Sequence, residues 1–216
     1  MLAAVLVAPH HDGHGPVHVV KSTTKRPCSG NASNDHLPAT IRVLRYAAHD
    51  ADGRGSQPTG VVTVGFKDYV RDAVLAEWIP SWDAAALETG AIAIKTYAWY
   101  WVNHYGGYFR KKSNCFDVTD DITFQRYVPG SSRAAGARAV DKTWPVLAKR
   151  SGAVFQASYR AYLHAPRESC GAASDGETLS QWGSQACAEA GMSVASILRK
   201  YYRDVQLSAA SSASTA

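Results

Sequence analysis

Hydrophobic residues recur every three or four positions along residues 68–79, which predicts an amphipathic helix. Pro80 ends this helix, because proline cannot continue the helical hydrogen bonding. A longer and almost wholly apolar helix is predicted over residues 82–104, with Asp83 as its N-cap. Charged and polar residues interrupt this apolar run, so we expect a buried core helix and no membrane span.

The rest of the pattern mixes strands with shorter helices. Strands are predicted from Thr40 and over residues 61–66, and the turn-forming residues between them favour a hairpin. The later elements that we expect are extended chain over 115–128, a helix over 132–143, strands over 145–147 and 153–162 joined by a turn, and helices over 180–191 and 193–202. Because this order is no βαβ alternation, the predicted fold class is α+β, a single mixed domain with short antiparallel strands packed around a buried helical pair.

The two ends of the chain lack periodicity. Residues 1–39 are rich in His, Gly, Pro, Ser and Asn, and we expect an irregular arm whose apolar start is at most a remnant of a secretory signal. Four of its histidines could hold a metal adventitiously, or simply belong to a polar arm, and we assign no role to them: His10, His11, His14 and His18. The folded domain is predicted over residues 40–207, and the Ser/Ala-rich residues 208–216 form a low-complexity tail.

Composition and charge narrow the function only slightly. The chain has 216 residues, 46% of them hydrophobic, which suffices for one substantial core. Its net charge of +5 is scattered, so no nucleic-acid surface is indicated; the excess suits an anionic polymer such as bacterial wall glycan, or is ordinary solubility charge. Four cysteines without CxxC spacing predict one or two disulfides and an oxidising, extracytoplasmic location, or else buried thiols. Cys170 and Cys187 flank a turn-rich loop and are the pair that we expect to be bridged.

Glu77 is an ionisable residue on the apolar face of the first helix. Desolvation there would raise the pKa of its carboxyl group, as a proton donor working near neutral pH requires. The alternative is that Glu77 lies at the edge of this face and pairs with Arg71 or Lys95. Periodicity alone does not decide between a general acid and a surface ion pair.

Several sequence blocks resemble the stage II sporulation protein D family, also called amidase enhancers. They run in the family's order from about Ile41 to Arg203 and read FKDYVRDAVLAEW, ALETGAIAIKTYAWYW, DITFQRY, SQWGSQACAEAGMS and ILRKYY. The resemblance implies a secreted or envelope-bound lytic transglycosylase that cleaves peptidoglycan glycan strands, especially strands without stem peptides. It also implies that Glu77, in the VLAEW block, is the catalytic acid and then the base, because the sugar's own 6-hydroxyl closes a 1,6-anhydro ring and no second carboxylate is needed.

The same resemblance marks further candidate residues on the second helix and in the DITFQRY block. Lys95 takes the place of the arginine that usually begins the family's RTYA block, and could face the acid or a substrate carboxylate, or snorkel at the helix edge. Gln125 and Tyr127 match the family's Q-x-Y element and either line a groove or pack on the core.

The SQWG block supplies three more candidate substrate-binding residues. Ser180 and Gln181 could hydrogen-bond sugar hydroxyls or N-acetyl groups, although Ser180 could equally cap a helix and Gln181 could be a surface residue. Trp182 and Trp78 are the tryptophans that we expect to stack on sugar rings, while most of the others belong to the core.

Two observations bear on alternative chemistry. Asp117, Asp120 and Asp121 either reach the site, which would make simple hydrolysis credible, or form a solvated acidic turn. Phe124 stands where some family members have a zinc-binding cysteine, so we predict no metal and no cofactor. A second hypothesis is a non-catalytic, glycan-binding enhancer whose partner is a cell-wall amidase.

Overall fold

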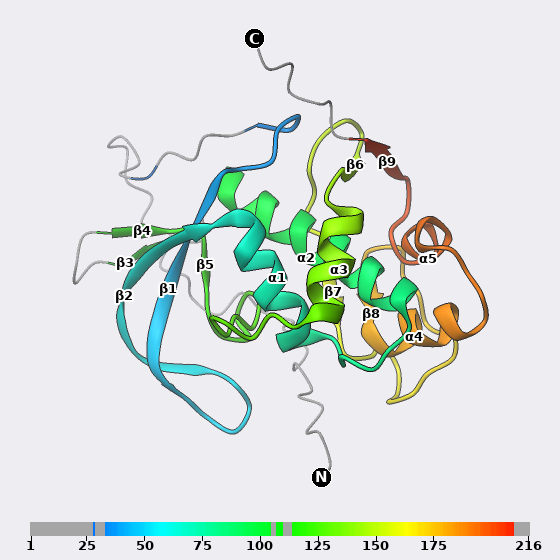
Figure 1. The fold of residues 1–216 in the computed structure, drawn as a ribbon, viewed down its shortest axis with the longest axis horizontal. Coiled ribbons are helices and arrows are strands. Elements are labelled where there is room, and N and C mark those ends of the chain that lie inside the picture. The colour runs from blue at the N-terminus through cyan, green and yellow to red at the C-terminus, as the bar shows by residue number, and fades with distance from the viewer. Residues whose placement is uncertain (1–27, 29–32, 105–106, 110–113, 210–216) are drawn as a thin grey trace.

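The computed structural model describes Cys28 and residues 33–104, 107–109 and 114–209, and its elements confirm the α+β class (Figure 1). In chain order they are β1 (Thr40–His49), β2 (Gly55–Gly65), α1 (Phe66–Glu77), α2 (Ala84–His104), β3 (Gly107–Phe109), β4 (Asn114–Phe116), β5 (Val118–Thr119), α3 (Ala134–Thr143), β6 (Val146–Arg150), β7 (Ser158–Arg160), β8 (Thr178–Ser180), α4 (Gln181–Glu189), α5 (Val194–Tyr201) and β9 (Val205–Ala209). The four sheets they form have two or three strands each.

The predicted hairpin is present as β1 and β2, which pair antiparallel. Ile41 and Val43 are fully buried, because alternate residues of a strand face the same side. On the other side of β1 the short strand β5 pairs in parallel, with Val43 opposite Val118. The predicted antiparallel pairing is thus joined by a parallel one that the sequence did not indicate, because a connection through α1 and α2 returns the chain beside β1 in the same direction.

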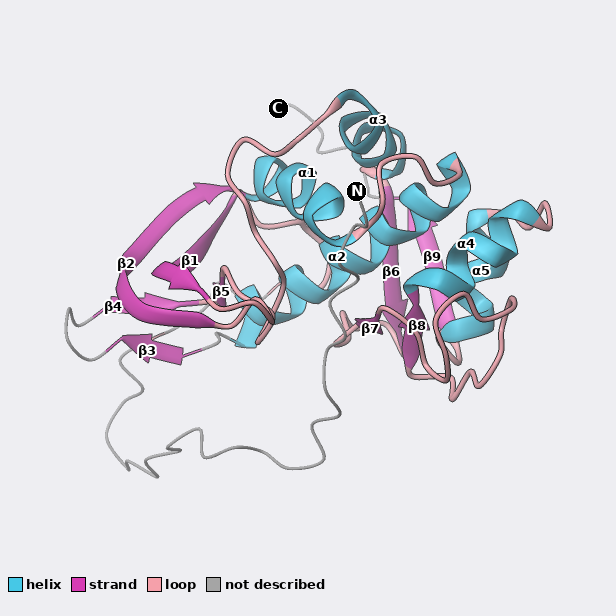
Figure 2. Cartoon of the chain, turned by 90° about the horizontal axis from the view of Figure 1, so that it is seen from below, coloured by secondary structure: helices cyan, strands magenta, loops and turns pink. Residues whose placement is uncertain are grey.

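The helix α2 lies at the centre of the fold. All of its residues from Ala86 to Trp99 are buried, as the nearly uninterrupted apolar run predicted. The helices α1, α3, α4 and α5 all contact α2, and Figure 2 shows the β1–β2 hairpin on one side of α1 and α2 and the β6–β9 and β7–β8 pairs on the other. None of the helices in the described part of the chain is long and apolar enough to span a membrane.

The C-terminal part contains strands that the sequence pattern did not predict. The strands β6 and β7 correspond to the two predicted segments, but β6 pairs antiparallel with β9 and β7 pairs parallel with β8. The three residues of β8 are too few for a period-two pattern to be recognised. The strand β9 extends to Ala209, two residues into the predicted low-complexity tail, because its backbone completes the ladder with β6.

Two disulfides connect distant parts of the chain. The expected bridge between Cys170 and Cys187 is present, and a second one joins Cys28 to Cys115. Ser33, from the end of the predicted arm, contacts α2, where its backbone carbonyl accepts hydrogen bonds from Trp99 Nε1 at 2.9 Å and Asn103 Nδ2 at 2.9 Å. The four histidines considered as metal ligands, His10, His11, His14 and His18, lie outside the described residues.

Candidate active site

Glu77 is the last residue of α1, and its carboxyl group is held by two segments that are distant in sequence. The backbone N–H of Arg126 donates to Oε1 at 2.6 Å, and Gln181 Nε2 donates to Oε2 at 3.3 Å. The chain becomes extended at Trp78, so the helix ends with Glu77 facing these two donors. The half-buried carboxyl group thus has a fixed position between α1, the loop before α3 and the start of α4.

The surroundings of Glu77 disfavour its charged form. Burial raises the pKa of Glu77, although the hydrogen bonds from Arg126 and Gln181 and the charge of Arg126 act in the opposite direction. Tyr69, Tyr97 and Tyr159 also lie near this carboxyl group. Burial is the largest cause that raises the pKa of each of their hydroxyl groups, and the negative charge of Glu77 adds to the rise. Glu77 is therefore a carboxyl group with a raised pKa among aromatic side chains, which is the kind of environment that suits a proton donor.

The helix α4 begins at this site. Ser180 is its N-cap, and Ser180 Oγ accepts a hydrogen bond from the Gly183 N–H at 2.8 Å. Since the side chain of Ser180 is fully buried, the structure gives it the capping role that we considered as the alternative to sugar binding. This cap fixes the first turn of α4, and Gln181, the first residue of the helix, reaches Glu77 from there.

Trp182 lies beside Gln181 and forms a pair with Trp82. Their ring centroids are 4.9 Å apart in an edge-on arrangement, and both side chains are only partly buried. Trp78, in contrast, is 1% exposed and donates from Nε1 to Ser184 Oγ at 3.4 Å. The expectation that Trp78 stacks on a sugar was therefore wrong, because helix packing leaves no face of its ring open.

Gln125 and Tyr127 support the site from the protein interior. Gln125 is fully buried; its Oε1 accepts a hydrogen bond from the Tyr69 hydroxyl at 3.1 Å, and its Nε2 donates to the Ile94 carbonyl at 3.3 Å. Tyr127 is 5% exposed and stacks on Tyr69 at a centroid distance of 4.9 Å. With both side chains anchored inward, the backbone N–H of Arg126 between them is held toward Glu77.

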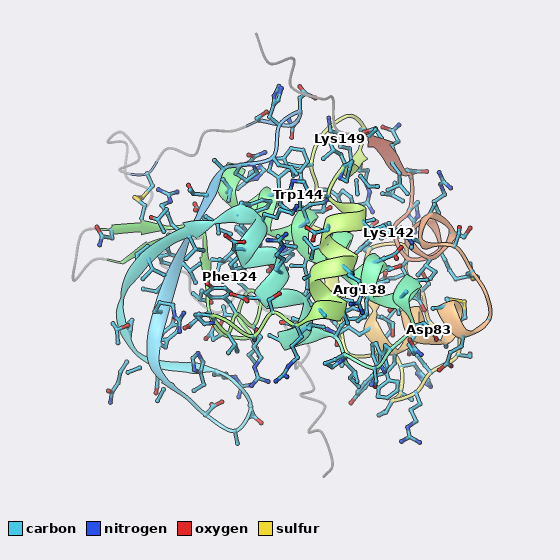
Figure 3. All side chains as sticks on the ribbon, in the orientation of Figure 1. Asp83, Phe124, Arg138, Lys142, Trp144 and Lys149 are labelled. Carbon is cyan, nitrogen blue, oxygen red and sulfur yellow. A yellow bond between two sulfur atoms is a disulfide. The ribbon has the colours of Figure 1, made fainter. Side chains whose placement is uncertain are left out.

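Lys95 does not join the group around Glu77. It is 1% exposed, and its Nζ donates to the carbonyls of Thr143 at 2.7 Å, Trp144 at 3.0 Å and Val146 at 2.7 Å. Burial, and after it the charge of Lys67, lowers the pKa of Lys95 to about 7. These three hydrogen bonds use all three protons of the Lys95 ammonium group, and they hold the connection between α3 and β6. Figure 3 shows Trp144, which lies in this connection, at the end of α3.

The three aspartates before Gln125 are buried and tie the β1–β2 hairpin to this part of the chain. Asp117 forms an ion pair with Arg42 at 2.5 Å, Asp120 one with Arg45 at 2.6 Å, and Asp121 accepts from the Gly55 N–H at 2.8 Å. Their exposed fractions are 2%, 1% and 3%, so the alternative of a solvated acidic turn was wrong. Each carboxylate is instead a buried acceptor for groups of the hairpin.

The position at which the resemblance would place a zinc-binding cysteine in some relatives is apolar in this chain. Phe124 lies in the loop before α3, edge-on to Trp101 at a centroid distance of 5.0 Å (Figure 3). Among the residues that the structure describes, no cluster of three or more His, Cys, Asp or Glu side chains could hold a metal ion.

Sequence reasoning missed part of this site. The donor from Arg126 is a backbone N–H, which every residue except proline has, so the residue type carries no signal. Tyr159 lies in β7, where it was read only as part of a strand. Tyr97 and Trp82 lie within or beside the quoted family blocks, and that proximity is the one signal that could have identified them.

Comparison with known proteins identifies one family. The sequence model of the stage II sporulation proteins, SpoIID, matches residues 54–165, just over half of the chain. This range contains Glu77, Arg126 and Tyr159, whereas Gln181 lies beyond it. A comparison with curated proteins gives no match.

Proposed function

Because the chain belongs to the SpoIID family of stage II sporulation proteins, we propose that it is a peptidoglycan lytic transglycosylase. It cleaves glycan strands, preferentially those without stem peptides, between N-acetylmuramic acid and N-acetylglucosamine, and leaves 1,6-anhydro ends. The observation that supports this proposal is a single glutamate, Glu77, with a raised pKa and two hydrogen-bond donors on its carboxyl group. One such group suffices for a reaction that needs no activated water.

The two oxygens of Glu77 differ in how they are held. Oε1 is anchored by the short bond from the Arg126 backbone, whereas the bond from Gln181 to Oε2 is long at 3.3 Å. Oε2 is therefore the oxygen that carries the proton. Oε2 donates this proton to the glycosidic oxygen as the bond from that oxygen to the anomeric carbon breaks. The carboxylate then accepts the proton of the 6-hydroxyl group, and the oxygen of this hydroxyl group bonds to the anomeric carbon.

The other carboxylates near the DITFQRY block favour this reaction over hydrolysis. A hydrolase uses a second carboxylate to activate water or to form a covalent intermediate. Asp117, Asp120 and Asp121 are each engaged with the β1–β2 hairpin and buried away from solvent. Their hydrogen bonds therefore support a mechanism in which Glu77 acts alone.

The partly exposed pair of Trp82 and Trp182 offers aromatic surface, and Trp182 directly follows Gln181, which donates a hydrogen bond to Glu77. Since aromatic faces bind the apolar faces of sugar rings, we assign this pair, together with Gln181, to glycan binding. Two disulfides suit a secreted or cell-envelope location, where the substrate is found.

The test is to incubate the protein with glycan strands stripped of stem peptides and to measure product masses. Fragments with anhydro ends support the transglycosylase, and fragments that contain one added water support a hydrolase. Binding without fragments would support the non-catalytic amidase enhancer. The three outcomes need no assumption about the host.

Glu77→Gln tests the assignment of the acid. Glutamine keeps the shape and can still accept the Arg126 hydrogen bond, but it has no proton to donate, so cleavage should fall by a factor of about 10²–10⁴ while strands still bind. Glu177→Gln is the matched control, because Glu177 forms an exposed ion pair with Arg150 and should leave cleavage unchanged. Normal cleavage by Glu77→Gln would show that another group is the acid.

A further inference from the structure

The hydroxyl group of Tyr159 is a buried polar group that lacks a hydrogen bond. Its oxygen is inaccessible to solvent and has no hydrogen-bond partner among the described residues. Folded proteins rarely leave a buried hydroxyl unsatisfied, because the lost hydration is not replaced, so such a group requires an explanation. In this chain the group lies next to the proposed catalytic acid.

The packing of β7 places Tyr159 beside Glu77. Its ring lies against Trp78, the residue after Glu77, at a centroid distance of 5.0 Å, and against Tyr97 at 6.2 Å. The parallel pairing of β7 with β8 sets Tyr159 opposite Leu179, two residues before the Gln181 that contacts Glu77. These three contacts therefore place Tyr159 among residues that flank Glu77 and its donor Gln181.

The other titratable groups that face Glu77 have different roles. Arg126 belongs to the loop before α3 and favours the carboxylate through its charge and its backbone N–H. Tyr69 on α1 donates its hydroxyl hydrogen to Gln125, and Tyr97 on α2 is a buried neutral group that the charge of Glu77 disfavours as a phenolate. The Tyr159 hydroxyl forms no hydrogen bond with the described residues, but it lies near enough to the Glu77 carboxyl group to lower the pKa of Glu77, while burial and then the charge of Glu77 raise the pKa of Tyr159 itself.

We propose that Tyr159 is a positioning residue whose hydroxyl donates a hydrogen bond to the Glu77 carboxylate after that carboxyl group has given up its proton. A hydroxyl hydrogen turns about a single bond, so the donor can engage when the charge appears and disengage when Glu77 is protonated again. The step named here depends on the proposed function, but the pairing of the two side chains is a property of the free protein. The state that Tyr159 stabilises is the one in which Glu77 must act as a base.

Tyr159→Phe removes only the hydroxyl. Titration of the Glu77 side-chain carboxyl carbon by NMR in the free protein should show its pKa rise by about one unit, since a donor to the charged form is lost. Glycan cleavage should slow about tenfold. The alkaline limb of its pH–rate profile should move to higher pH by the same amount as the pKa of Glu77. The melting temperature should stay the same or rise, because the variant no longer buries an unsatisfied hydroxyl.

Tyr202→Phe is the matched control. The Tyr202 hydroxyl is also buried, but it donates to the Ser158 carbonyl at 2.9 Å, next to Tyr159 on the same strand. This variant should lower the melting temperature and leave the Glu77 titration unchanged. The two phenylalanine variants therefore separate an effect on the acid from an effect on packing.

The outcomes also separate this inference from the proposed function. An unchanged Glu77 titration in Tyr159→Phe, or an equal shift in Tyr202→Phe, overturns the inference even if Glu77→Gln abolishes cleavage. If the wild-type protein does not cleave glycan, the transglycosylase proposal fails, and the titration still decides whether Tyr159 and Glu77 are coupled.

Discussion

Replacing Asp117 by asparagine should destabilise the protein strongly without affecting the chemistry. Asp117 Oδ2 accepts from the backbone N–H of Arg42 at 2.7 Å, and Oδ1 accepts from Arg42 Nη2 at 2.5 Å. The side chain of Asp117 is 3% exposed and that of Arg42 is 29% exposed. Breaking a fully buried ion pair costs about 3–5 kcal/mol; because water can reach part of the guanidinium, we expect a loss of about 3 kcal/mol in the free energy of unfolding.

The measurement is denaturant unfolding at pH 7 of the wild type, Asp117→Asn and the control Asp52→Asn. Asp52 also pairs with an arginine of the hairpin region, Arg54, at 2.9 Å, but the two side chains are 66% and 48% exposed, so its loss should cost less than about 0.5 kcal/mol. Equal costs for the two variants would refute the argument from burial. Loss of glycan cleavage in folded Asp117→Asn would refute the assignment of Glu77 as the only carboxylate in the reaction.

Two further predictions concern the stability of the site. Because the folded pKa of Glu77 is raised above its ordinary value of 4.5, its contribution to stability is complete below pH 4.5 and is lost as the pH rises through the folded pKa. Glu77→Gln should therefore gain stability over the wild type as the pH rises, and unfolding between pH 4 and 8 that shows a constant difference would contradict this. A β-carbon at Gly90 would lie 2.6 Å from the ring of the buried Trp78, so Gly90→Ala should lower the free energy of unfolding by about 1–2 kcal/mol. Thermal or denaturant unfolding of Gly90→Ala measures this change. A rise of about 1 kcal/mol in the free energy of unfolding, as expected for alanine in a solvent-exposed helix, would show that the Trp78 ring moves aside at little cost.

The long patterns in the sequence predicted the fold around α2 correctly. The twenty-one residues of α2 carry enough positions for their apolar character to be recognised, whereas β2 was predicted only over residues 61–66 although it begins at Gly55. The pairing of the short strands could not be predicted, because β7 and β8 have three residues each and their partners are set by tertiary packing. The pairing of the parallel strand β5 was even less predictable, because this strand has only two residues.

The candidate site could be predicted from the sequence only where the type of a residue limits the contacts that its side chain can make. Glu77 stood out as an acid on an apolar face, and the structure brings Gln181 to it as a hydrogen-bond donor. Lys95 shows the limit of such reasoning, because the sequence contains a lysine in an apolar helix but gives no sign that carbonyls 48–51 residues later accept all its protons. The backbone donor of Arg126 had no sequence signal at all.

The two hydrogen-bond donors of Glu77 are far from it along the chain. Arg126 follows Glu77 by 49 residues and Gln181 follows it by 104, so neither contact exists while the first half of the protein is being synthesised. Closing loops of this length is entropically costly, and such contacts form late in folding. In a nascent chain Glu77 therefore lacks both donors, and the arrangement around its carboxyl group is complete only when translation and folding are nearly finished.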